Sequence, residues 1–294
     1  MKKILITGAN SYIGTSVESH LNKFGDKYIV DTIDMLDGMW REKDFSEYQV
    51  VFHVAGIAHS DSGKISEEKA KLYYAVNTDL TIETAQKAKT DGVAQFIFMS
   101  SAIVYGDSAP IGRSKLITKD TPVSPANCYG DSKVQAEIGI NTLADDSFKV
   151  VVLRPPMIYG NGSKGNYPVL SKFARKLPFF PFVKNERSMI YIENFCEFVR
   201  LMIENEETGT FWPQNKEYSN TSYMVQTIAA VHGKKMRLVK GFTWALKLIG
   251  FCTGMVNKAF GNLSYDQKLS VYKEDYQLVS LSESILKTEG KNND

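Results

Sequence analysis

Residues 3–14 read KILITGANSYIG, and this stretch decides the fold. Residues 3–7 are a short apolar run rich in strand formers, and a helix-like stretch follows the loop to about Asn22. In a strand, glycine loop and helix of this kind, the backbone approaches a pyrophosphate, whose charge is met by free N–H groups at the helix start. The sequence therefore predicts a dinucleotide-binding unit at the start of the chain.

The loop departs from the usual three-glycine pattern at one position. Ser11 stands between Gly8 and Gly14, where the middle glycine normally lies. Serine needs more room than glycine and tolerates a positive φ poorly. The loop is an imperfect match, so its interpretation depends on the rest of the chain.

Two later apolar runs predict further strands of the same sheet. Residues 50–56 read VVFHVAG and residues 95–101 read QFIFMSS, so each run ends in small or polar residues. Such runs are typical of buried parallel strands. A ligand of an open α/β sheet lies beyond the carboxyl ends of its strands. The residues that we expect to converge there are Gly8, Ala55, Gly56 and Ser101.

Tyr129 and Lys133 are spaced by one helical turn, so the lysine ammonium can approach the ring of the tyrosine. A free phenol has a pKa of about 10, and a base that works near neutrality needs a pKa roughly 3 units lower. An adjacent cation shifts the pKa in that direction. Oxidation of an alcohol requires such a base while the hydride leaves for a nicotinamide, so redox chemistry is the leading interpretation.

Several motifs in a fixed order carry a family resemblance. They are residues 7–14, residues 53–56, Asn77, residues 100–106, residues 129–133, residues 153–155 and residues 159–160. Together they resemble the extended short-chain dehydrogenases/reductases of the nucleotide-sugar epimerase and dehydratase family, which includes UDP-galactose 4-epimerase. The resemblance covers most of the chain. It implies an α/β fold, a Rossmann-type doubly wound parallel sheet with a smaller C-terminal substrate-binding domain.

The same resemblance implies a division of the chain and a catalytic triad. We expect residues 1–165 to form the dinucleotide-binding domain, with residues 187–205 returning to it, and residues 166–294 to form mainly the substrate-binding domain. Tyr129 would be the acid/base, Ser101 would hydrogen-bond the reacting hydroxyl, and Lys133 would also hold the nicotinamide ribose. As a prediction, Tyr129→Phe keeps the fold and the bound cofactor but loses turnover.

The implied cofactor is NAD, with NADP as the alternative. The residues expected to bind it are Gly8, Asn10, Ser11, Tyr12, Ile13, Gly14, Asp34, Met35, Val54, Ala55, Gly56, Asn77, Tyr129, Lys133 and Pro155. An acidic residue about twenty positions after the loop accepts the ribose hydroxyls, and both Asp31 and Asp34 lie near that distance. Neither the loop nor the position after Asp34 carries an arginine or lysine, which favours NAD, although Arg41 could reverse this preference.

The expected substrate is a nucleotide sugar, most simply a UDP-linked one. The residues that the resemblance assigns to it are Ser101, Ala102, Tyr129, Asn166 and Arg187. Arg187 suits a diphosphate because an arginine can meet phosphate oxygens in a fork. Met157 stands where relatives often carry an asparagine on the substrate side, so the sugar contacts stay open.

Residues 102 and 103 reduce the number of reactions that the family resemblance allows. Dehydratases of the family carry an Asp-Glu pair directly after the position of Ser101, whereas this chain has Ala102 and Ile103, which cannot move a proton. We therefore expect C4 epimerisation of a UDP-hexose or UDP-N-acetylhexosamine. The alternatives are an NAD(P)H-dependent 4-ketoreductase of a UDP-4-keto-6-deoxy sugar and a non-catalytic dinucleotide-binding regulator.

Composition favours a soluble cytoplasmic enzyme. The chain has 294 residues, 43% of them hydrophobic, and a formal charge of +2. Lys and Arg are scattered among acidic residues, which argues against a nucleic acid partner. The three cysteines are too few and too dispersed for a disulfide framework or a zinc site, so we expect no metal and a reducing compartment.

The apolar stretch 242–256 is interrupted by Lys247 and is too short to span a bilayer, so no transmembrane segment is expected. Two interpretations stay open for it. It packs against the substrate domain or a dimer partner, or it forms a membrane-surface patch near a lipid-linked sugar. The family resemblance also implies a homodimer, formed by the helix near Tyr129 and one at residues 78–88.

Overall fold

The computed structural model describes residues 1–57, 65–242, 257 and 259–290. Residues 243–256, most of the apolar stretch noted above, lie outside the described residues. The chain forms two compact units. Unit 1 comprises Met1–Gly106, Pro122–Pro155 and Phe195–Pro213, and unit 2 comprises Asp107–Thr121, Pro156–Asn194 and Gln214–Asp294.

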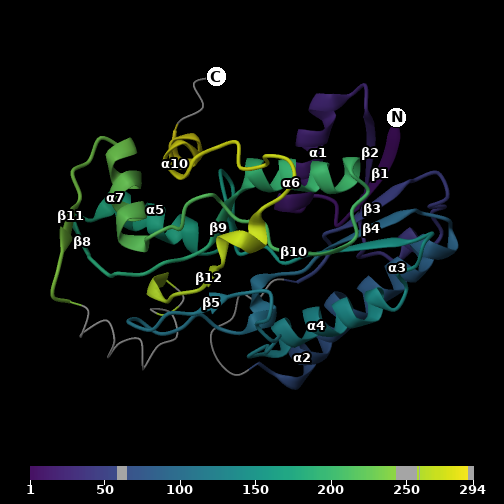
Figure 1. Cartoon of the computed structure of the whole chain (residues 1–294), viewed down its shortest axis with the longest axis horizontal. Helices are drawn as coiled ribbons and strands as arrows, with labels where there is room; N and C mark the ends of the chain where they lie inside the picture. Colours follow the sequence, from purple (N-terminus) through teal and green to yellow (C-terminus); the bar gives the residue numbers. More distant parts are fainter. Residues whose placement is uncertain (58–64, 243–256, 258, 291–294) are drawn as a thin grey trace. The chain divides into compact units, whose positions relative to one another are not determined.

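Unit 1 is built on a six-stranded sheet in the order β10-β6-β4-β3-β1-β2, and all neighbouring strands are parallel (Figure 1). The strands are β1 (Lys2–Thr7), β2 (Tyr28–Ile33), β3 (Val50–His53), β4 (Gln95–Met99), β6 (Lys149–Leu153) and β10 (Gly209–Phe211). The predicted Rossmann-type parallel sheet is confirmed. All four residues of β3 are buried, as expected of a strand covered on both faces.

The helices of unit 1 follow the strands in sequence. They are α1 (Tyr12–Leu21), α2 (Glu67–Tyr74), α3 (Leu80–Thr90), α4 (Cys128–Asn141) and most of α6 (Ile192–Glu204), with the short turns η1 (Asn22–Phe24), η2 (Met39–Arg41) and η4 (Ala102–Tyr105). A π-helical turn, η3 (Ala75–Asp79), joins α2 to α3. One hydrophobic cluster, which includes Trp40, Phe45, Phe96, Phe98 and Phe148, forms a core of this unit.

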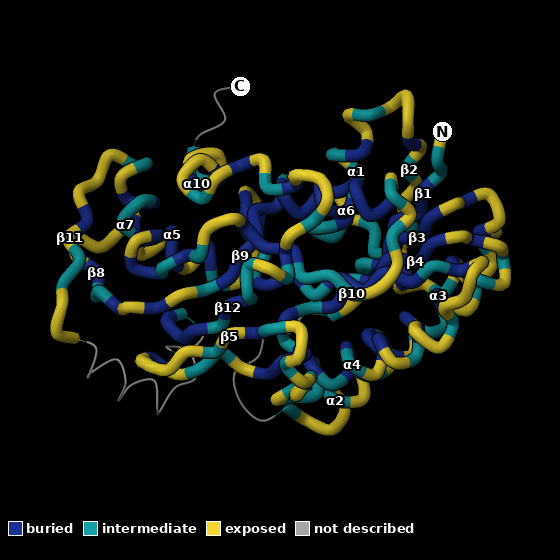
Figure 2. Tube along the Cα trace, viewed as in Figure 1, coloured by how far each residue is buried: buried dark blue, intermediate teal, exposed yellow. Residues whose placement is uncertain are grey.

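The described part of unit 2 contains helices and small strand pairs. The helices are α5 (Asn166–Lys176), α7 (Thr221–Val231) and α10 (Leu281–Glu289), together with the turn η5 (Gln267–Ser270). The strand pairs, all parallel, are β7 (Met157–Tyr159) with β9 (Met189–Tyr191), β8 (Phe179–Pro181) with β11 (Arg237–Val239), and β5 (Leu116–Ile117) with β12 (Ser264–Tyr265). Figure 2 shows that each helix of this unit has both buried and exposed positions.

Candidate functional site

Gly8, directly after β1, lies in close contact with the backbone of Ala55, which follows β3. Its φ is +82°, and a Cβ at this position would lie 2.9 Å from both the Cα and the N of Ala55. The N–H groups of Gly8 and Ala9 both donate to the Ile33 carbonyl at the end of β2, at 2.9 and 3.1 Å. The carboxyl ends of β1, β2 and β3 therefore meet at this loop, and of these the sequence predicted the ends of β1 and β3.

Ser11 is accommodated because another residue takes the left-handed conformation. Asn10 has a φ of +64°, a region that asparagine tolerates, whereas Ser11 has a φ of −74° and is the N-cap of α1. The Ser11 hydroxyl oxygen accepts a hydrogen bond from the Gly14 N–H at 3.1 Å. The missing middle glycine is thus replaced by a capping serine that holds the first turn of α1.

The first turn of α1 contains a buried hydroxyl whose partner is not among the described residues. The Tyr12 side-chain oxygen is inaccessible and accepts or donates no hydrogen bond within that part of the chain, and burial raises the Tyr12 pKa. Ile13 follows it in the same turn. An orphaned hydroxyl at a helix start that follows a glycine loop fits a phosphate-bearing group such as NAD.

The two candidate acidic residues after β1 differ in their surroundings. Asp31 lies within β2 and accepts a hydrogen bond from the Tyr48 hydroxyl at 2.6 Å. Asp34 follows the end of β2, is exposed, and accepts a hydrogen bond from the Leu36 N–H at 2.9 Å, while Met35 beside it is buried. Asp34 is therefore the carboxylate at the ligand-binding edge of the sheet.

Arg41, which could have favoured NADP, is engaged elsewhere. Both its Nε and its Nη2 donate to the carboxylate of Glu83 on α3, and its guanidinium lies 4.5 Å from the centre of the Trp40 ring. Because this carboxylate already neutralises the guanidinium, the structure gives no support to a 2′-phosphate contact by Arg41.

Asn77, in the π-helical turn η3, ties the segment after β3 to α4. Its Oδ1 accepts from the Ile57 N–H at 2.9 Å, and its Nδ2 donates to the Ile57 carbonyl at 3.1 Å and to the Ser132 hydroxyl at 3.2 Å. A Cβ on Gly56 would lie 3.0 Å from Asn77 Oδ1 and 3.2 Å from Lys133 Nζ. Gly56 thus lies directly beside the Lys133 ammonium, and Val54 and Ala55 precede it in the same segment.

Tyr129 lies in the first turn of α4, which is capped by Asn127. The Asn127 Oδ1 accepts from the Gly130 N–H at 2.9 Å, so the N-cap fixes the start of the helix. The Tyr129 phenol is hydrogen-bonded to the Ser101 hydroxyl, and this bond lowers the Tyr129 pKa. Burial acts more strongly in the opposite direction and raises the pKa to about 12.

This direction is opposite to the one expected from the spacing of Tyr129 and Lys133. The Lys133 Nζ donates to the Met99 carbonyl at 3.0 Å and lies 4.7 Å from the centre of the Phe98 ring. Its own pKa is lowered by burial to about 8, while the Glu137 carboxylate raises it. The ammonium is therefore directed at the end of β4, and the Ser101 hydroxyl is the group that lowers the phenol pKa.

A buried polar network behind Lys133 was not found by sequence reasoning. Glu137 is bound by the Arg154 guanidinium, with Nε to Oε1 at 3.1 Å and Nη2 to Oε2 at 2.5 Å, and it accepts a hydrogen bond from the Ser100 hydroxyl. Arg154 also donates to the Tyr105 hydroxyl at 2.7 Å, as does Trp212 Nε1 at 2.7 Å. The one signal in the sequence was the four-residue spacing of Lys133 and Glu137 on one helix.

A backbone hydrogen bond between Ala102 and Pro155 joins the segments that follow β4 and β6. The Ala102 N–H donates to the Pro155 carbonyl at 2.9 Å, and both side chains are buried. Unit 1 therefore brings together the predicted catalytic residues and the predicted cofactor-binding residues after β1, β2, β3, β4 and β6.

Asn166 and Arg187 both belong to unit 2, on different elements. Asn166 is the first residue of α5, and Arg187 precedes β9. The Arg187 Nη1 donates to the Gly261 carbonyl at 3.2 Å, and burial lowers the Arg187 pKa to about 10, so the guanidinium stays charged near neutrality.

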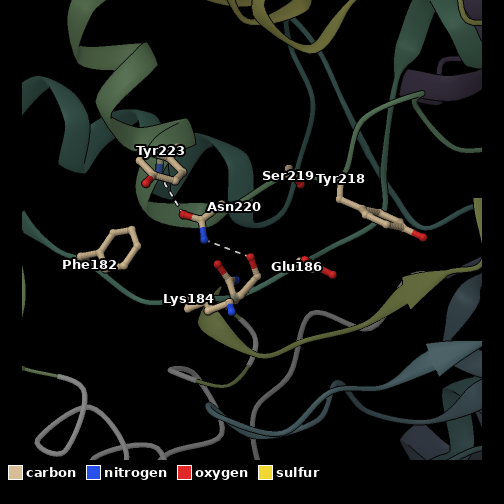
Figure 3. Close-up of a pocket in the computed structure, with 8 residues that line it drawn as sticks. Phe182, Lys184, Glu186, Tyr218, Ser219, Asn220 and Tyr223 are labelled. Atoms are coloured by element: carbon tan, nitrogen blue, oxygen red, sulfur yellow. Dashed lines mark hydrogen bonds between the residues drawn. The ribbon is translucent and has the colours of Figure 1, made fainter.

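Beside Arg187 lies a pocket of about 360 Å³ (Figure 3). It is lined by Phe182, Lys184, Asn185, Glu186, Tyr218, Ser219, Asn220 and Tyr223. The backbones of Arg187 and Ser219 exchange two hydrogen bonds, at 3.0 and 2.9 Å. The rings of Phe182 and Tyr223 meet edge to face with their centres 5.6 Å apart. Asn220, which caps α7, donates to the carbonyls of Val183 and Asn185. The amides of Asn185 and Asn220 are thus engaged within unit 2, and the two aromatic rings are the groups of this pocket that suit a planar ligand.

Among the described residues, no three His, Cys, Asp or Glu side chains gather in a way that could hold a metal ion. In the same part of the chain, no helix has both the length and the apolar character needed to cross a membrane.

The fold and this edge of the sheet define a dinucleotide-binding protein in which a serine after β4 is hydrogen-bonded to a tyrosine at the start of α4. Residues 4–212 match the model of the NAD dependent epimerase/dehydratase family, and the chain belongs to that family. It is an NAD-dependent epimerase or oxidoreductase of the extended short-chain dehydrogenase/reductase type.

Three known proteins illustrate the similarity. The chain is 31% identical to UDP-glucose 4-epimerase of Vibrio cholerae over 92% of this chain and 85% of that protein. It is 25% identical to N-acetyl-alpha-D-glucosaminyl-diphospho-ditrans,octacis-undecaprenol 4-epimerase of Escherichia coli O157:H7, over 88% and 81% respectively. The fold matches that of UDP-glucuronic acid 4-epimerase from Bacillus cereus in complex with NAD, with a TM-score of 0.73, 18% identity and coverage of 98% and 97%.

Proposed function

We propose that this enzyme catalyses C4 epimerisation of a UDP-hexose or a UDP-N-acetylhexosamine, with Tyr129 as the acid/base. The observation that carries the proposal is the hydrogen bond between Ser101 and Tyr129 at the start of α4, one helical turn before the buried Lys133. The names of the two curated relatives share a 4-epimerisation of a sugar, which supports this reaction.

The residues of unit 1 would hold NAD along the carboxyl edge of the sheet. Gly8 and the first turn of α1 would meet the pyrophosphate, Asp34 would accept the ribose hydroxyls, and Asn77 would support the segment beside Lys133. When bound, NAD accepts and returns the hydride of the sugar, and its positively charged nicotinamide favours a phenolate nearby. Bound cofactor would thus offset the effect of burial on the Tyr129 pKa.

Tyr129 would remove the proton from the sugar 4-hydroxyl as the hydride leaves carbon 4. Ser101 would donate a hydrogen bond to the reacting oxygen, and Lys133 would keep a positive charge at the site. After the keto sugar turns over, Tyr129 would return the proton when the hydride arrives on the other face. This sequence needs no acid and base next to Ser101, which agrees with Ala102 and Ile103 in those positions.

Unit 2 supplies groups for the rest of the substrate. We propose that Arg187 binds the diphosphate and that Asn166 contributes a further polar contact. The pocket beside Arg187 carries the rings of Phe182 and Tyr223, which suit a planar base, and this supports a nucleotide-linked sugar such as a UDP-sugar.

We further propose that the enzyme is a cytoplasmic homodimer that pairs through α3 and α4. Ile138 on α4 is 56% exposed, which is the support for an apolar contact there. Measurement of the mass in solution for the wild type and for Ile138→Glu tests this assembly.

The test of the proposed reaction is incubation of purified protein, with no added cofactor, with UDP-glucose, UDP-galactose and their N-acetyl forms. Chromatography with mass detection should show a product of unchanged mass and shifted retention, and the Tyr129→Phe protein should give none. Conversion of none of the four sugars, together with reduction of a 4-keto sugar nucleotide by added NAD(P)H, would instead make the enzyme a ketoreductase. No reaction in either assay and no reduction of bound NAD by any sugar nucleotide would favour a dinucleotide-binding regulator.

A further inference from the structure

Helix α5 of unit 2 has two apolar faces, and only one of them is buried. Tyr167, Leu170, Ser171 and Ala174 face the interior. Beside this face, Val169 and Phe173, together with Leu177 directly after the helix, repeat every four residues and are 49%, 42% and 41% exposed. Lys172 and Lys176, also exposed, lie along one side of this stripe. Exposed apolar residues in a continuous stripe, with cations along one side, distinguish this face from an ordinary solvated helix face.

The connection from α7 to β11 extends this surface. The Lys234 ammonium donates to the carbonyl of Arg175 at the end of α5. Arg237 pairs in register with Phe179, which is 58% exposed, so both side chains lie on the same exposed side of the β8–β11 pair. We call this surface the basic–apolar face. It comprises Val169, Lys172, Phe173, Arg175, Lys176, Leu177, Phe179, Lys234, Lys235 and Arg237, exposed positions that Figure 2 draws in yellow.

The charge around this face is one-sided. The chain as a whole has a net charge of only +2, yet residues 147–185 and residues 218–265 contain no Asp or Glu. An acidic side chain of the described residues, Glu289, reaches α5 from the inner side. Glu289 on α10 accepts a hydrogen bond from Ser171 at 2.8 Å and pairs with His232 at 2.7 Å. The lysines and arginines of the basic–apolar face therefore produce a positive electrostatic potential on this side of the unit.

We propose that the basic–apolar face docks the enzyme on an anionic phospholipid surface. A surface-lying helix that presents aromatic and aliphatic side chains next to lysines suits the boundary between headgroups and acyl chains. The apolar side chains enter that boundary, and the lysine and arginine heads stay at the phosphate level. A second copy of the same face would oppose like charges, so the charge complementarity selects a lipid surface over self-association.

Lipid binding goes beyond the proposed epimerase activity and does not depend on it. A catalytically silent Tyr129→Phe protein should bind vesicles as the wild type does. Conversely, a protein that converts UDP-sugars but ignores vesicles would keep the proposed reaction and overturn the docking surface. The vesicle experiment can therefore contradict lipid binding without affecting the proposed epimerase activity, and the activity assay can do the reverse.

The experiment is flotation of the full chain with vesicles of phosphatidylglycerol mixed with phosphatidylcholine, compared with phosphatidylcholine alone. We expect binding only to the anionic vesicles, and weaker binding as salt is added. Lys172→Glu/Lys176→Glu should weaken that binding by at least about tenfold, because each cation near the surface adds to the attraction. Val169→Ser/Phe173→Ser, which keeps the charge, should weaken it as well.

The matched control is Lys119→Glu/Lys268→Glu, which makes the same charge change at two exposed lysines elsewhere on unit 2. This variant should bind vesicles as the wild type does. Thermal unfolding of all variants checks that they fold, and none of the changed residues belongs to the proposed active site. Absence of vesicle binding by the wild type would overturn the proposal. So would equal loss in the control variant, or a dimer that only the α5 variants disrupt.

Discussion

Glu137 lies one helical turn after Lys133 on α4, and its carboxylate raises the pKa of the Lys133 ammonium against the lowering effect of burial. The balance leaves the Lys133 pKa at about 8, so the ammonium loses its proton as the pH rises through that value. If the reaction needs the charged form, activity should be full below the pKa and should decline above it.

Glu137→Gln removes the charge that supports the Lys133 ammonium. The Lys133 pKa should fall further, and the alkaline decline of kcat/KM should move to lower pH. The change also leaves the buried Arg154 without its charged partner, which should cost about 3 kcal/mol of stability. A pH profile and thermal unfolding measure the two effects. Glu67→Gln, which removes one partner of the exposed ion pair with Lys71 on α2, is the control and should change neither. An unchanged pH profile in Glu137→Gln would show that Lys133 charge does not limit the reaction.

Tyr129→Phe removes the proposed acid/base and should lower kcat by several orders of magnitude, because no other group takes the proton. Fold and bound NAD should stay, as judged by thermal unfolding and by the cofactor released on denaturation. Ser101→Ala keeps the phenol but removes the hydrogen bond that lowers its pKa, so the pH at which activity rises should shift upward. Near-normal turnover by the phenylalanine variant would exclude Tyr129 as the acid/base.

Asp34→Asn and Asp31→Asn separate the two acidic residues near the ribose position. We expect Asp34→Asn to weaken NAD binding by about tenfold, since a charge-assisted hydrogen bond to the ribose is lost. Asp31 is held by Tyr48 within the structure, so Asp31→Asn should lower stability and leave NAD affinity unchanged. Titration calorimetry with NAD measures both. The reverse result would assign the ribose to Asp31.

Gly8→Ala and Gly92→Ala compare two glycines of nearly equal backbone conformation. Their φ values are +82° and +86°, so alanine costs about 1–2 kcal/mol at either site from this strain alone. A Cβ at Gly8 also meets the Ala55 backbone at 2.9 Å, whereas no atom lies within 4 Å at Gly92. Urea unfolding should therefore show a larger loss for Gly8→Ala, and only this variant should lose bound NAD. Equal losses would mean that the loop relaxes away from Ala55.

Arg187→Ala tests the proposed diphosphate contact. KM for the sugar nucleotide should rise by at least about tenfold, since a charged hydrogen bond to phosphate is removed, while the amount of bound NAD stays the same. Arg113→Ala, at an exposed arginine of the same unit, is the control and should leave KM unchanged. A fall in kcat with a constant KM would indicate a role in unit 2 packing instead.

The sequence predicted the sheet and its ligand-binding edge because both depend on local patterns. The apolar runs at β1, β3 and β4 end in small or polar residues, and this is visible without coordinates. The same pattern identified the segments that bring Gly8, Ala55 and Ser101 to one edge. Ser11 did not disturb this edge, because capping and the conformation of Asn10 compensate for the missing glycine.

Burial and long-range partners limited what the sequence could predict. Lys133 follows Tyr129 by four positions. This spacing does not reveal that the Lys133 ammonium donates to the Met99 carbonyl or that burial has the largest effect on the Tyr129 pKa. Likewise, Trp212 and Tyr105 are 107 positions apart and meet only because β10 joins the sheet next to β6. Such contacts follow from topology rather than from any local pattern.

The π-helical turn η3 makes the connection from α2 to α3 tolerant of a change in length. A π turn holds one more residue than an α turn over the same rise, so it behaves as a built-in one-residue insertion. Deletion of one residue in Ala75–Asp79 would therefore return the connection to a regular α-helix with α2 and α3 still in phase. Tyr73, whose ring lies 5.8 Å from that of Tyr129, and Tyr74, which donates to Asp131, would then keep their contacts with α4. A deletion within the regular turns of α3 would instead rotate its two parts by about 100° against each other, so natural length changes in this region should fall in the π turn.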